Sequence, residues 1–228
     1  MRLRVLVHNV RGLRGGPGAV GRVVDRFAPD LLLLNETGAR RRLRELTRGA
    51  GLEVASDPPS PSRRRVRNAV LVRPPWRIVR RRMLRFEGST RWYPRGALIA
   101  SVGRSGYRLW AVSVHLGLRP EERRRHAEQL SDALRGLDGP VVIGGDLNET
   151  SDRPAAAFLS ERFWDAWLLG GDAAGETYPS EDPTARIDYL FVSEGVRVER
   201  VLVPADGEAR QVSDHLPVVA ELQLPEPG

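Results

Sequence analysis

Apolar and polar positions in the first part of the chain predict a strand, a helix and a second strand. Residues 2–10 read as a strand because apolar side chains recur at alternate positions. Apolar residues fall at helical spacing from 17 to 28, and Pro17 suits the first turn of that helix. Residues 31–34 are leucines, which indicates a buried strand. We therefore expect the chain to open with a βαβ unit.

The rest of the chain predicts strands at short spacing, followed by helices and strands in alternation. We expect a short helix over 39–48, strands over 54–55, 68–72, 77–86, 96–102 and 107–114, the clearest helix over 120–137, a strand over 141–143, a short helix over 154–160, and strands over 186–192, 196–203 and 218–222. Strands without helices between them favour antiparallel neighbours. Loops are expected over 57–62 and 170–176, and Trp164, Trp167 and Leu168 are expected in the core.

Length and composition fit one domain over residues 1–228. The chain has 228 residues, 41% of them hydrophobic, and contains no linker or internal repeat. No apolar run approaches the roughly 18 residues of a membrane span, and the N-terminal pattern lacks the features of a signal peptide. Cysteine is absent, which excludes disulfides and thiolate metal sites. We expect a monomeric, cytoplasmic protein, although the absence of cysteine is compatible with any compartment.

Positive charge is concentrated in one segment. The net charge is +7, and residues 63–95 hold twelve arginines and a single acidic residue, Glu87. The same segment carries four aromatic residues, Trp76, Phe86, Trp92 and Tyr93. Arginine interleaved with aromatic side chains is typical of surfaces that bind nucleic acid. All 36 basic residues of the chain are arginine, however, so a general bias toward this residue explains the segment equally well.

The stretch VVIGGDLNET, residues 141–150, is the most informative motif. A β-branched run stops at Gly144 and Gly145 and is followed by Asp146 and Asn148. Because side chains alternate along an extended segment, we expect the carboxylate and the amide to point the same way. We expect the glycines to let a bulky group, such as a metal-bound phosphate, approach the backbone. Taken alone, the motif fits an ordinary turn after a strand equally well.

Polar side chains recur where the apolar strands end. The set comprises Asn9, Glu36, His115, Asp146, Asn148, Asp188, Asp214 and His215. Because strand ends converge on one rim of a sheet, these groups are expected to meet in space. Oxygen ligands, Glu36 and Asp214 above all, suit Mg²⁺ or Mn²⁺ rather than zinc. Carboxylates, a histidine and such a metal can direct water at a phosphate ester.

Seven segments resemble, in order, the motifs of the endonuclease/exonuclease/phosphatase superfamily, the DNase I-like fold. They are HNVRG, NET, VSVHLG, GGDLNET, TYPS, RIDYLFVS and SDHLPV, and they cover nearly the whole chain. GDLN followed by SDH is the most specific pair. The resemblance implies a four-layer α/β sandwich, in which two mixed sheets pack face to face and helices lie outside. It also implies a metal-dependent phosphoesterase.

The resemblance assigns metal and water roles to the acidic and amide residues. Glu36 resembles the main metal-binding glutamate of the family, with Asn9 beside it. Asp214 resembles a second metal or water ligand. Asp146 resembles the residue that orients or deprotonates the attacking water, and Asn148 resembles its companion, which contacts the phosphate.

The four histidines divide into two groups under the same resemblance. His215 matches the residue that donates to a phosphate oxygen, and Asp188 matches the carboxylate that holds that histidine in the right tautomer. His115 occupies the position of a group that contacts the phosphate or the leaving group, although a histidine at a strand end can also serve only the fold. His8 and His126 are interpreted as structural.

Three further residues are candidates for substrate binding, and one position departs from the family pattern. Asn68 and Arg95 resemble positions near the rim of the pocket, where a purely structural role is equally consistent. Tyr178 is either a packing aromatic or a substrate contact. Arg11 stands two residues after Asn9, where some nucleases of the family carry a second acid, and this weakens any two-metal mechanism. The chain is also short for the family.

Our leading hypothesis is a Mg²⁺- or Mn²⁺-dependent phosphodiesterase that acts on nucleic acid, as an endonuclease or an exonuclease. An alternative is a phosphatase or a hydrolase of phospholipids or inositol phosphates, because arginine clusters also bind multiply phosphorylated groups. A non-catalytic nucleic-acid-binding module is a remote third hypothesis, since no position of the catalytic type is lost.

Overall fold

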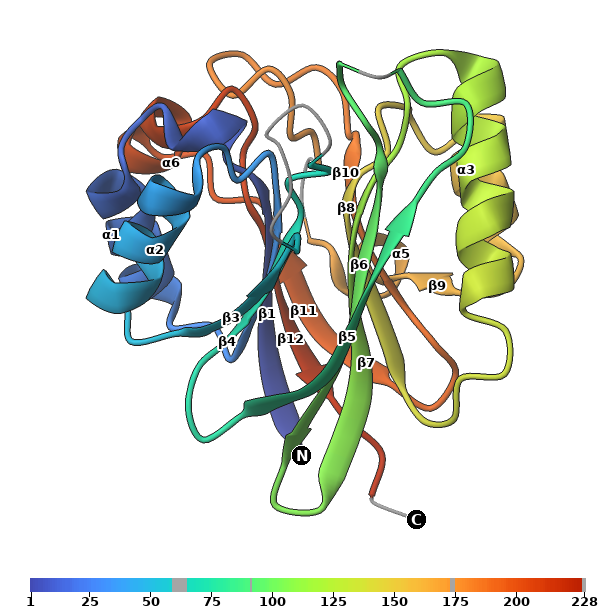
Figure 1. Ribbon diagram of the computed structural model, residues 1–228, viewed down its shortest axis with the longest axis horizontal. Coiled ribbons are helices and arrows are strands. Elements are labelled where there is room, and N and C mark those ends of the chain that lie inside the picture. The colour runs from blue at the N-terminus through green and yellow to red at the C-terminus, as the bar shows by residue number, and fades with distance from the viewer. Residues whose placement is uncertain (59–64, 91, 173–174, 227–228) are drawn as a thin grey trace.

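Two six-stranded sheets pack face to face, and helices cover the outer face of each (Figure 1). The computed structural model describes residues 1–58, 65–90, 92–172 and 175–226. This arrangement confirms the predicted four-layer sandwich. Parts of the expected loops, residues 59–62 and 173–174, lie outside the described residues, as do positions 63, 64 and 91 of the arginine-rich segment.

The first sheet is built around one parallel pair of strands. Its order is β11 (Arg197–Leu202), β12 (Val218–Gln223), β1 (Arg2–Asn9), β2 (Leu31–Asn35), β4 (Ala69–Val72) and β3 (Glu53–Ser56). Strands β1 and β2 are parallel, and the other neighbours are antiparallel. The outer face is covered by α1 (Pro17–Phe27), which links β1 to β2, by α2 (Arg40–Gly49) and by the short α6 (Gly207–Val212) (Figure 1).

The second sheet repeats this plan. Its order is β5 (Arg77–Arg85), β6 (Gly96–Arg104), β7 (Tyr107–His115), β8 (Val141–Asp146), β10 (Asp188–Val192) and β9 (Trp164–Asp165). The predicted antiparallel run from β5 to β7 is confirmed, and β7 and β8 form the parallel pair. Helices α3 (Pro120–Ala133), which links β7 to β8, and α4 (Pro154–Ser160) cover the outer face. Helix α5 (Ala166–Gly170) packs against β10 and β11.

Buried apolar side chains fill the space between the sheets and the space under each helical layer. The prediction that Trp164 and Leu168 belong to the core is wrong, because their exposed fractions are 50% and 75%. Both lie on the short edge segment β9–α5, where the side that faces away from the sheet meets solvent. Trp167 is partly buried and packs against the core between the sheets. Among the helices described, none has the length and apolarity that crossing a membrane requires.

The ends of the two parallel pairs bring polar residues to one edge of the sandwich. Asn9 pairs in register with Asn35 at the carboxyl ends of β1 and β2. His115 pairs with Asp146 at the ends of β7 and β8. Asp188 begins β10 rather than ending a strand, and it reaches the same edge because β10 runs antiparallel to β8. The edge is therefore shared by two sheets.

The two glycines of the GGD motif serve the packing of the sheets rather than the approach of a ligand, which corrects the expectation from the sequence. A Cβ atom at Gly144 would lie 2.5 Å from Val7 of the opposite sheet. A Cβ atom at Gly145 would lie 1.8 Å from the carbonyl oxygen of Val114 and 2.9 Å from Oδ1 of Asn35. Glycine is required at position 144 because the two sheets approach closely beneath the polar edge. At position 145 it is required because both the paired strand β7 and Asn35 of the opposite sheet leave no room for a Cβ atom.

We expect Gly145→Ala to lower the free energy of unfolding by about 3 kcal/mol, because the added methyl group meets backbone that cannot move away cheaply. Chemical denaturation followed by circular dichroism would measure the change. Gly18→Ala is the control, because a Cβ atom at Gly18 meets nothing within 4 Å. Equal stability of the two variants would contradict the close approach.

Candidate active site

Asp146 ends β8 and is held by four groups. Its Oδ2 accepts a hydrogen bond from Nδ2 of Asn9 at 3.0 Å and lies 3.2 Å from Nε2 of His115. Its Oδ1 accepts from the backbone N–H of Asn148 at 2.8 Å. Its own backbone N–H donates to Oδ1 of Asn35 at 3.0 Å. The carboxylate is buried, and both sheets fix its orientation.

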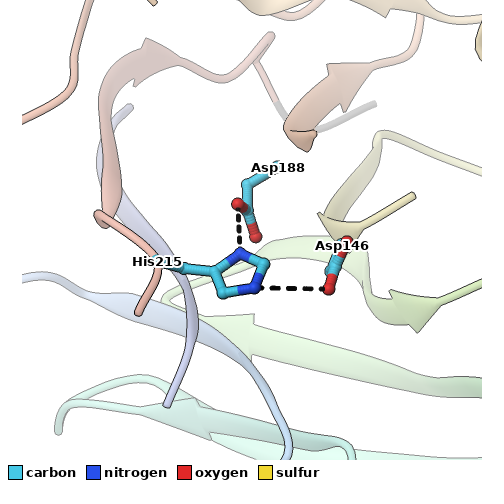
Figure 2. A group of neighbouring side chains, drawn as sticks. All are labelled: Asp146, Asp188 and His215. Carbon is cyan, nitrogen blue, oxygen red and sulfur yellow. Dashed lines mark hydrogen bonds and ion pairs between the residues drawn. The ribbon is translucent and has the colours of Figure 1, made fainter. Parts of the chain in front are cut away.

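His215 lies between two aspartates (Figure 2). Its Nδ1 donates to Oδ2 of Asp188 at 2.8 Å, and its Nε2 is 3.9 Å from Oδ2 of Asp146. The hydroxyl of Thr177 also donates to Oδ2 of Asp188, at 2.7 Å. His8 is fully buried, and its Nε2 donates to the backbone carbonyl oxygen of His215 at 3.0 Å. Nε2 of His215 therefore faces the edge while Nδ1 is fixed.

The charges of these groups shift their protonation equilibria. Burial alone would lower the pKa of His215, but the charge and hydrogen bond of Asp188, together with the charge of Asp146, raise it to about 9. Burial opposes ionisation of Asp146, yet His115 and His215 hold the pKa of that carboxyl well below its usual range. The site is therefore built around an anionic Asp146 beside a cationic His215.

His115 and Arg95 form the opposite side of the site. Nη1 of Arg95 lies 2.7 Å from Nδ1 and 2.6 Å from Nε2 of the His115 ring. Because Nε2 also faces Asp146, the consistent arrangement has Nδ1 accepting from Arg95 and Nε2–H donating to Asp146. The guanidinium group of Arg95 is thus held against the imidazole ring of His115 rather than free in solvent.

Glu36 and Asp214 line a pocket of about 260 Å³ that opens beside His115. We call it the arginine pocket, because its wall includes Arg11, Arg14, Arg65, Arg67 and Arg95. Trp92 and Tyr93 also line it, each with an exposed fraction of 70%. Trp76 and Phe86, the other aromatics of the same segment, are buried in the core instead. The surface aromatics are therefore fewer than the sequence indicated, but they lie at the pocket.

The remaining candidates take different positions. Asn68 is buried, and its Nδ2 donates to the carbonyl oxygens of Gly96 and Ser113 at 2.9 Å each, a geometry that favours a brace within the fold over substrate contact. Tyr178 is 40% exposed, and its ring lies 4.9 Å from that of His215. Asn148 has a φ of 54°, so strand alternation ends at Asp146, and its Nδ2 donates to the carbonyl oxygen of Leu116 at 3.2 Å.

The sequence analysis did not single out Asn35 and Thr177 as site residues. Asn35 is a polar residue at the end of a strand of leucines, and this contrast was the available signal. Thr177 begins the TYPS segment, but its contact with Asp188 depends on a loop fold that no sequence period reveals.

A protein-family model described as the Endonuclease/Exonuclease/phosphatase family matches residues 6–215, the span that carries these groups. The chain belongs to the endonuclease/exonuclease/phosphatase family. Members of this family are phosphoesterases, and the chain is a hydrolase of that class. No curated protein sequence matches the chain.

Solved structures share the fold of this family at low sequence identity. An endonuclease/exonuclease/phosphatase from Bacteroides vulgatus is 18% identical with a TM-score of 0.86, and the match covers 98% of this chain and 99% of that one. The mannosyl-6-phosphatase Bt3783 of Bacteroides thetaiotaomicron is 19% identical with a TM-score of 0.80, and the match covers 97% of this chain and 100% of that one. D. rerio TDP2 complexed with a single-strand DNA product is 18% identical with a TM-score of 0.76, and the match covers 97% of this chain and 99% of that one.

Enzymes of the endonuclease/exonuclease/phosphatase family generally depend on a divalent metal, and two groups of donors are available here. Ligand atoms of Asp146, Asp188 and His215 all lie within 4.8 Å of one another. However, Oδ2 of Asp188 already accepts from His215 and Thr177, and a protonated His215 repels a cation. Glu36 presents a half-exposed carboxylate to the arginine pocket, and its nearest recorded cation, Arg95, is 4.0 Å away. The oxygen donors of Glu36 therefore fit Mg²⁺ or Mn²⁺ better than the cluster of Asp146, Asp188 and His215 does.

We expect an NMR titration of the metal-free protein to give His215 a pKa near 9, above the ordinary 6.5, because Asp188 stabilises the charged ring. Asp188→Asn should lower this pKa, because burial then disfavours the charged ring without the opposing negative charge of Asp188. The pKa of His215 in the fold lies above its ordinary value of 6.5. The protonated ring therefore stabilises the fold fully below about pH 6.5, and this contribution to stability is lost as the pH rises through about 9.

His126 is the internal control of this titration. Burial lowers its pKa to about 4, and its Nδ1 accepts from the backbone N–H of Gly117. Its resonances should stay constant from neutral pH upwards. A His215 that titrates at 6.5 or below would contradict the role assigned to Asp188.

Proposed function

We propose that the chain is a Mg²⁺- or Mn²⁺-dependent phosphodiesterase that acts on nucleic acid. The observation that carries this proposal is the fixed set Asp188–His215–Asp146, which opens next to the arginine pocket. On one edge, an anionic carboxylate can orient the attacking water, and a cationic imidazole can stabilise the charge on the phosphate oxygens. We expect the enzyme to be a monomer located in the cytoplasm.

Glu36, with Asn9 and Asp214, would hold the metal ion. When bound, the ion supplies positive charge that polarises a phosphate oxygen. The backbone of Glu36 has a φ of 50°, an uncommon conformation for a residue other than glycine, and its carbonyl oxygen accepts from the N–H of Gly12 at 2.6 Å. The loop therefore fixes this carboxylate at the pocket at some conformational cost, which supports a functional role.

The residues of the chain then have separate tasks. Asp146, with its lowered pKa, stays ionised and orients the attacking water by accepting a hydrogen bond from it. His215 places a proton on Nε2 for a phosphate oxygen, because Asp188 occupies Nδ1. Arg95 supplies positive charge and His115 donates a hydrogen bond on the other side of the carboxylate. Asn148, whose backbone N–H donates to Asp146, is the proposed contact of the phosphate.

The arginine pocket supports a nucleic-acid substrate. Guanidinium groups bind phosphates, often through two parallel hydrogen bonds. Exposed aromatic rings such as Trp92 and Tyr93 offer surfaces on which unpaired bases stack. Both features meet next to the catalytic edge, which is what a phosphodiester between nucleosides requires. The similar TDP2 structure contains a single-strand DNA product.

A second candidate is a phosphatase, or a hydrolase of phospholipids or inositol phosphates. The excess of arginine over acid on the pocket wall would equally suit a small substrate with several phosphates. A mannosyl-6-phosphatase is among the similar structures. Activity with and without EDTA on a panel of DNA, RNA, phosphomonoesters and small phosphodiesters separates the two candidates. Metal-dependent cleavage of small esters alone would exclude the nucleic-acid proposal.

We expect His215→Ala to lower the turnover number by about 10²- to 10⁴-fold on the best substrate of the panel, because a group that donates to the phosphate in the transition state is lost. Asp146→Asn should lose a similar factor, since the water is no longer oriented by a charged acceptor. Circular dichroism would confirm that each variant is folded. A loss of less than about tenfold in His215→Ala would assign this residue to the fold.

We expect Glu36→Gln to raise the metal concentration needed for half-maximal activity, because the amide is a weaker ligand than the carboxylate. Titration of Mg²⁺ and Mn²⁺ at fixed substrate measures the shift. Glu53→Gln is the control, since Glu53 lies on the edge strand β3, outside the arginine pocket. An unchanged metal dependence would remove Glu36 from the set of ligands.

A further inference from the structure

Arg11 lies beside Asp214, on the wall of the arginine pocket. It follows β1 in a short 3-10 turn (Arg11–Leu13), where its φ is 43°, a left-handed conformation that is uncommon outside glycine. Its backbone N–H donates to Oδ1 of Asn9 at 3.1 Å. Its Nε lies 3.2 Å from Oδ2 of Asp214, the residue before His215. The turn thus directs a guanidinium group at one of the two carboxylates expected to bind metal.

Arg11 and Asp214 also separate two pockets. The arginine pocket lies on one side. On the other side lies a pocket of about 660 Å³, which we call the α6 pocket, between the loop 178–182 and helix α6. Arg11, Arg14 and Asp214 line both pockets, and Tyr178 lines the second. A phosphate ester with a substituent in each pocket would therefore pass the side chain of Arg11, which is about half exposed.

The charge of Arg11 restricts what Asp214 can bind. Opposite unit charges at about 3 Å attract strongly at the margin of a protein, and the same guanidinium group repels any further cation that approaches the carboxylate. Among the described residues, the structure records no hydrogen bond from either Nη group of Arg11, and its shortest contact with Asp214 is through Nε. The Nη groups therefore retain donors for an anion in either pocket.

We propose that Arg11 is the fixed second cation of this active site. It neutralises Asp214, so that the site takes one divalent ion, at Glu36 and Asn9, rather than two. Its Nη groups contact the phosphate oxygens where the two pockets meet, which makes Arg11 a catalytic residue. This proposal rests on the proposed function, and it removes Asp214 from the metal ligands named above.

The first test counts metal ions in the absence of substrate. Isothermal titration calorimetry with Mn²⁺, together with the electron paramagnetic resonance signal of free Mn²⁺, gives the number of sites per chain. We expect one ion in the wild type and two in Arg11→Asp, which places a second carboxylate beside Asp214. Arg14→Gln is the matched control, because Arg14 lines both pockets but has no recorded ion pair, and it should bind one ion.

The second test measures turnover on the best substrate of the panel. Arg11→Gln should lose about 10²-fold in the turnover number, which is typical for the removal of one donor aimed at transition-state charge. Arg48→Gln is the control for turnover and should stay close to the wild type, because Arg48 is exposed on the outer helix α2 and lines neither pocket. Free guanidinium ion added to Arg11→Ala should restore part of the lost turnover, and it should restore none in His215→Ala, where a different group is missing.

The outcomes separate this proposal from the proposed function. Two ions in the wild type, or equal turnover in Arg11→Gln and the control Arg48→Gln, would overturn the role of Arg11 while metal-dependent hydrolysis stands. No Mn²⁺ binding and no hydrolysis of any ester by the wild type would overturn both. One ion in the wild type, two in Arg11→Asp and rescue by guanidinium would support the proposal.

Discussion

The amide of Asn35 joins the two sheets directly beneath the catalytic edge. Its Oδ1 accepts from the backbone N–H of Asp146, and its Nδ2 donates to the carbonyl oxygen of Val114 at 2.9 Å and lies 3.2 Å from both Oδ1 of Asn68 and Oγ of Ser113. All of these groups are buried, so an unmatched partner would carry the full desolvation cost of a polar group, about 1–3 kcal/mol. The network therefore fixes the distance between the sheets, and Gly145 is the residue small enough to permit it.

This connection explains how opposing electrostatic effects can coexist at the edge. Burial disfavours both the charge of Asp146 and that of His215, yet each is stabilised by the other and by a second partner, His115 or Asp188. Such compensation requires fixed distances, because a carboxylate that moved away would leave a buried charge unpaired. The rigid strand ends supply these distances, and the chemistry of the site depends on the packing of the sheets below it.

Alternation and strand ends predicted the strands and the edge at which polar residues gather, because these are local properties of the chain. The four layers were predicted by the family resemblance. It could not predict what the glycines of GGD face, because Val7 and Asn35 reach them from the opposite sheet only when the sheets pack, and Val114 reaches Gly145 only when β7 pairs with β8. For the same reason the bracing role of Asn35 was missed. The apolar pattern predicts a buried Trp164, but burial at a sheet edge depends on which side the neighbouring elements cover, and no local pattern shows that side.

Most of the candidate catalytic residues lie on strands, whereas the residues expected to select the substrate lie on loops. Asn9, His115, Asp146 and Asp188 are strand residues, held by register and by the network between the sheets. The walls of both pockets come mainly from loops, the segments 11–15, 65–67, 92–95 and 178–182. Loops can change without disturbing the sheets, so structures that share this fold at under 20% identity can present different walls to the same edge. Arg11 belongs to such a loop yet contacts Asp214 of the catalytic edge, so a change at this one position alters the charge of the catalytic edge itself.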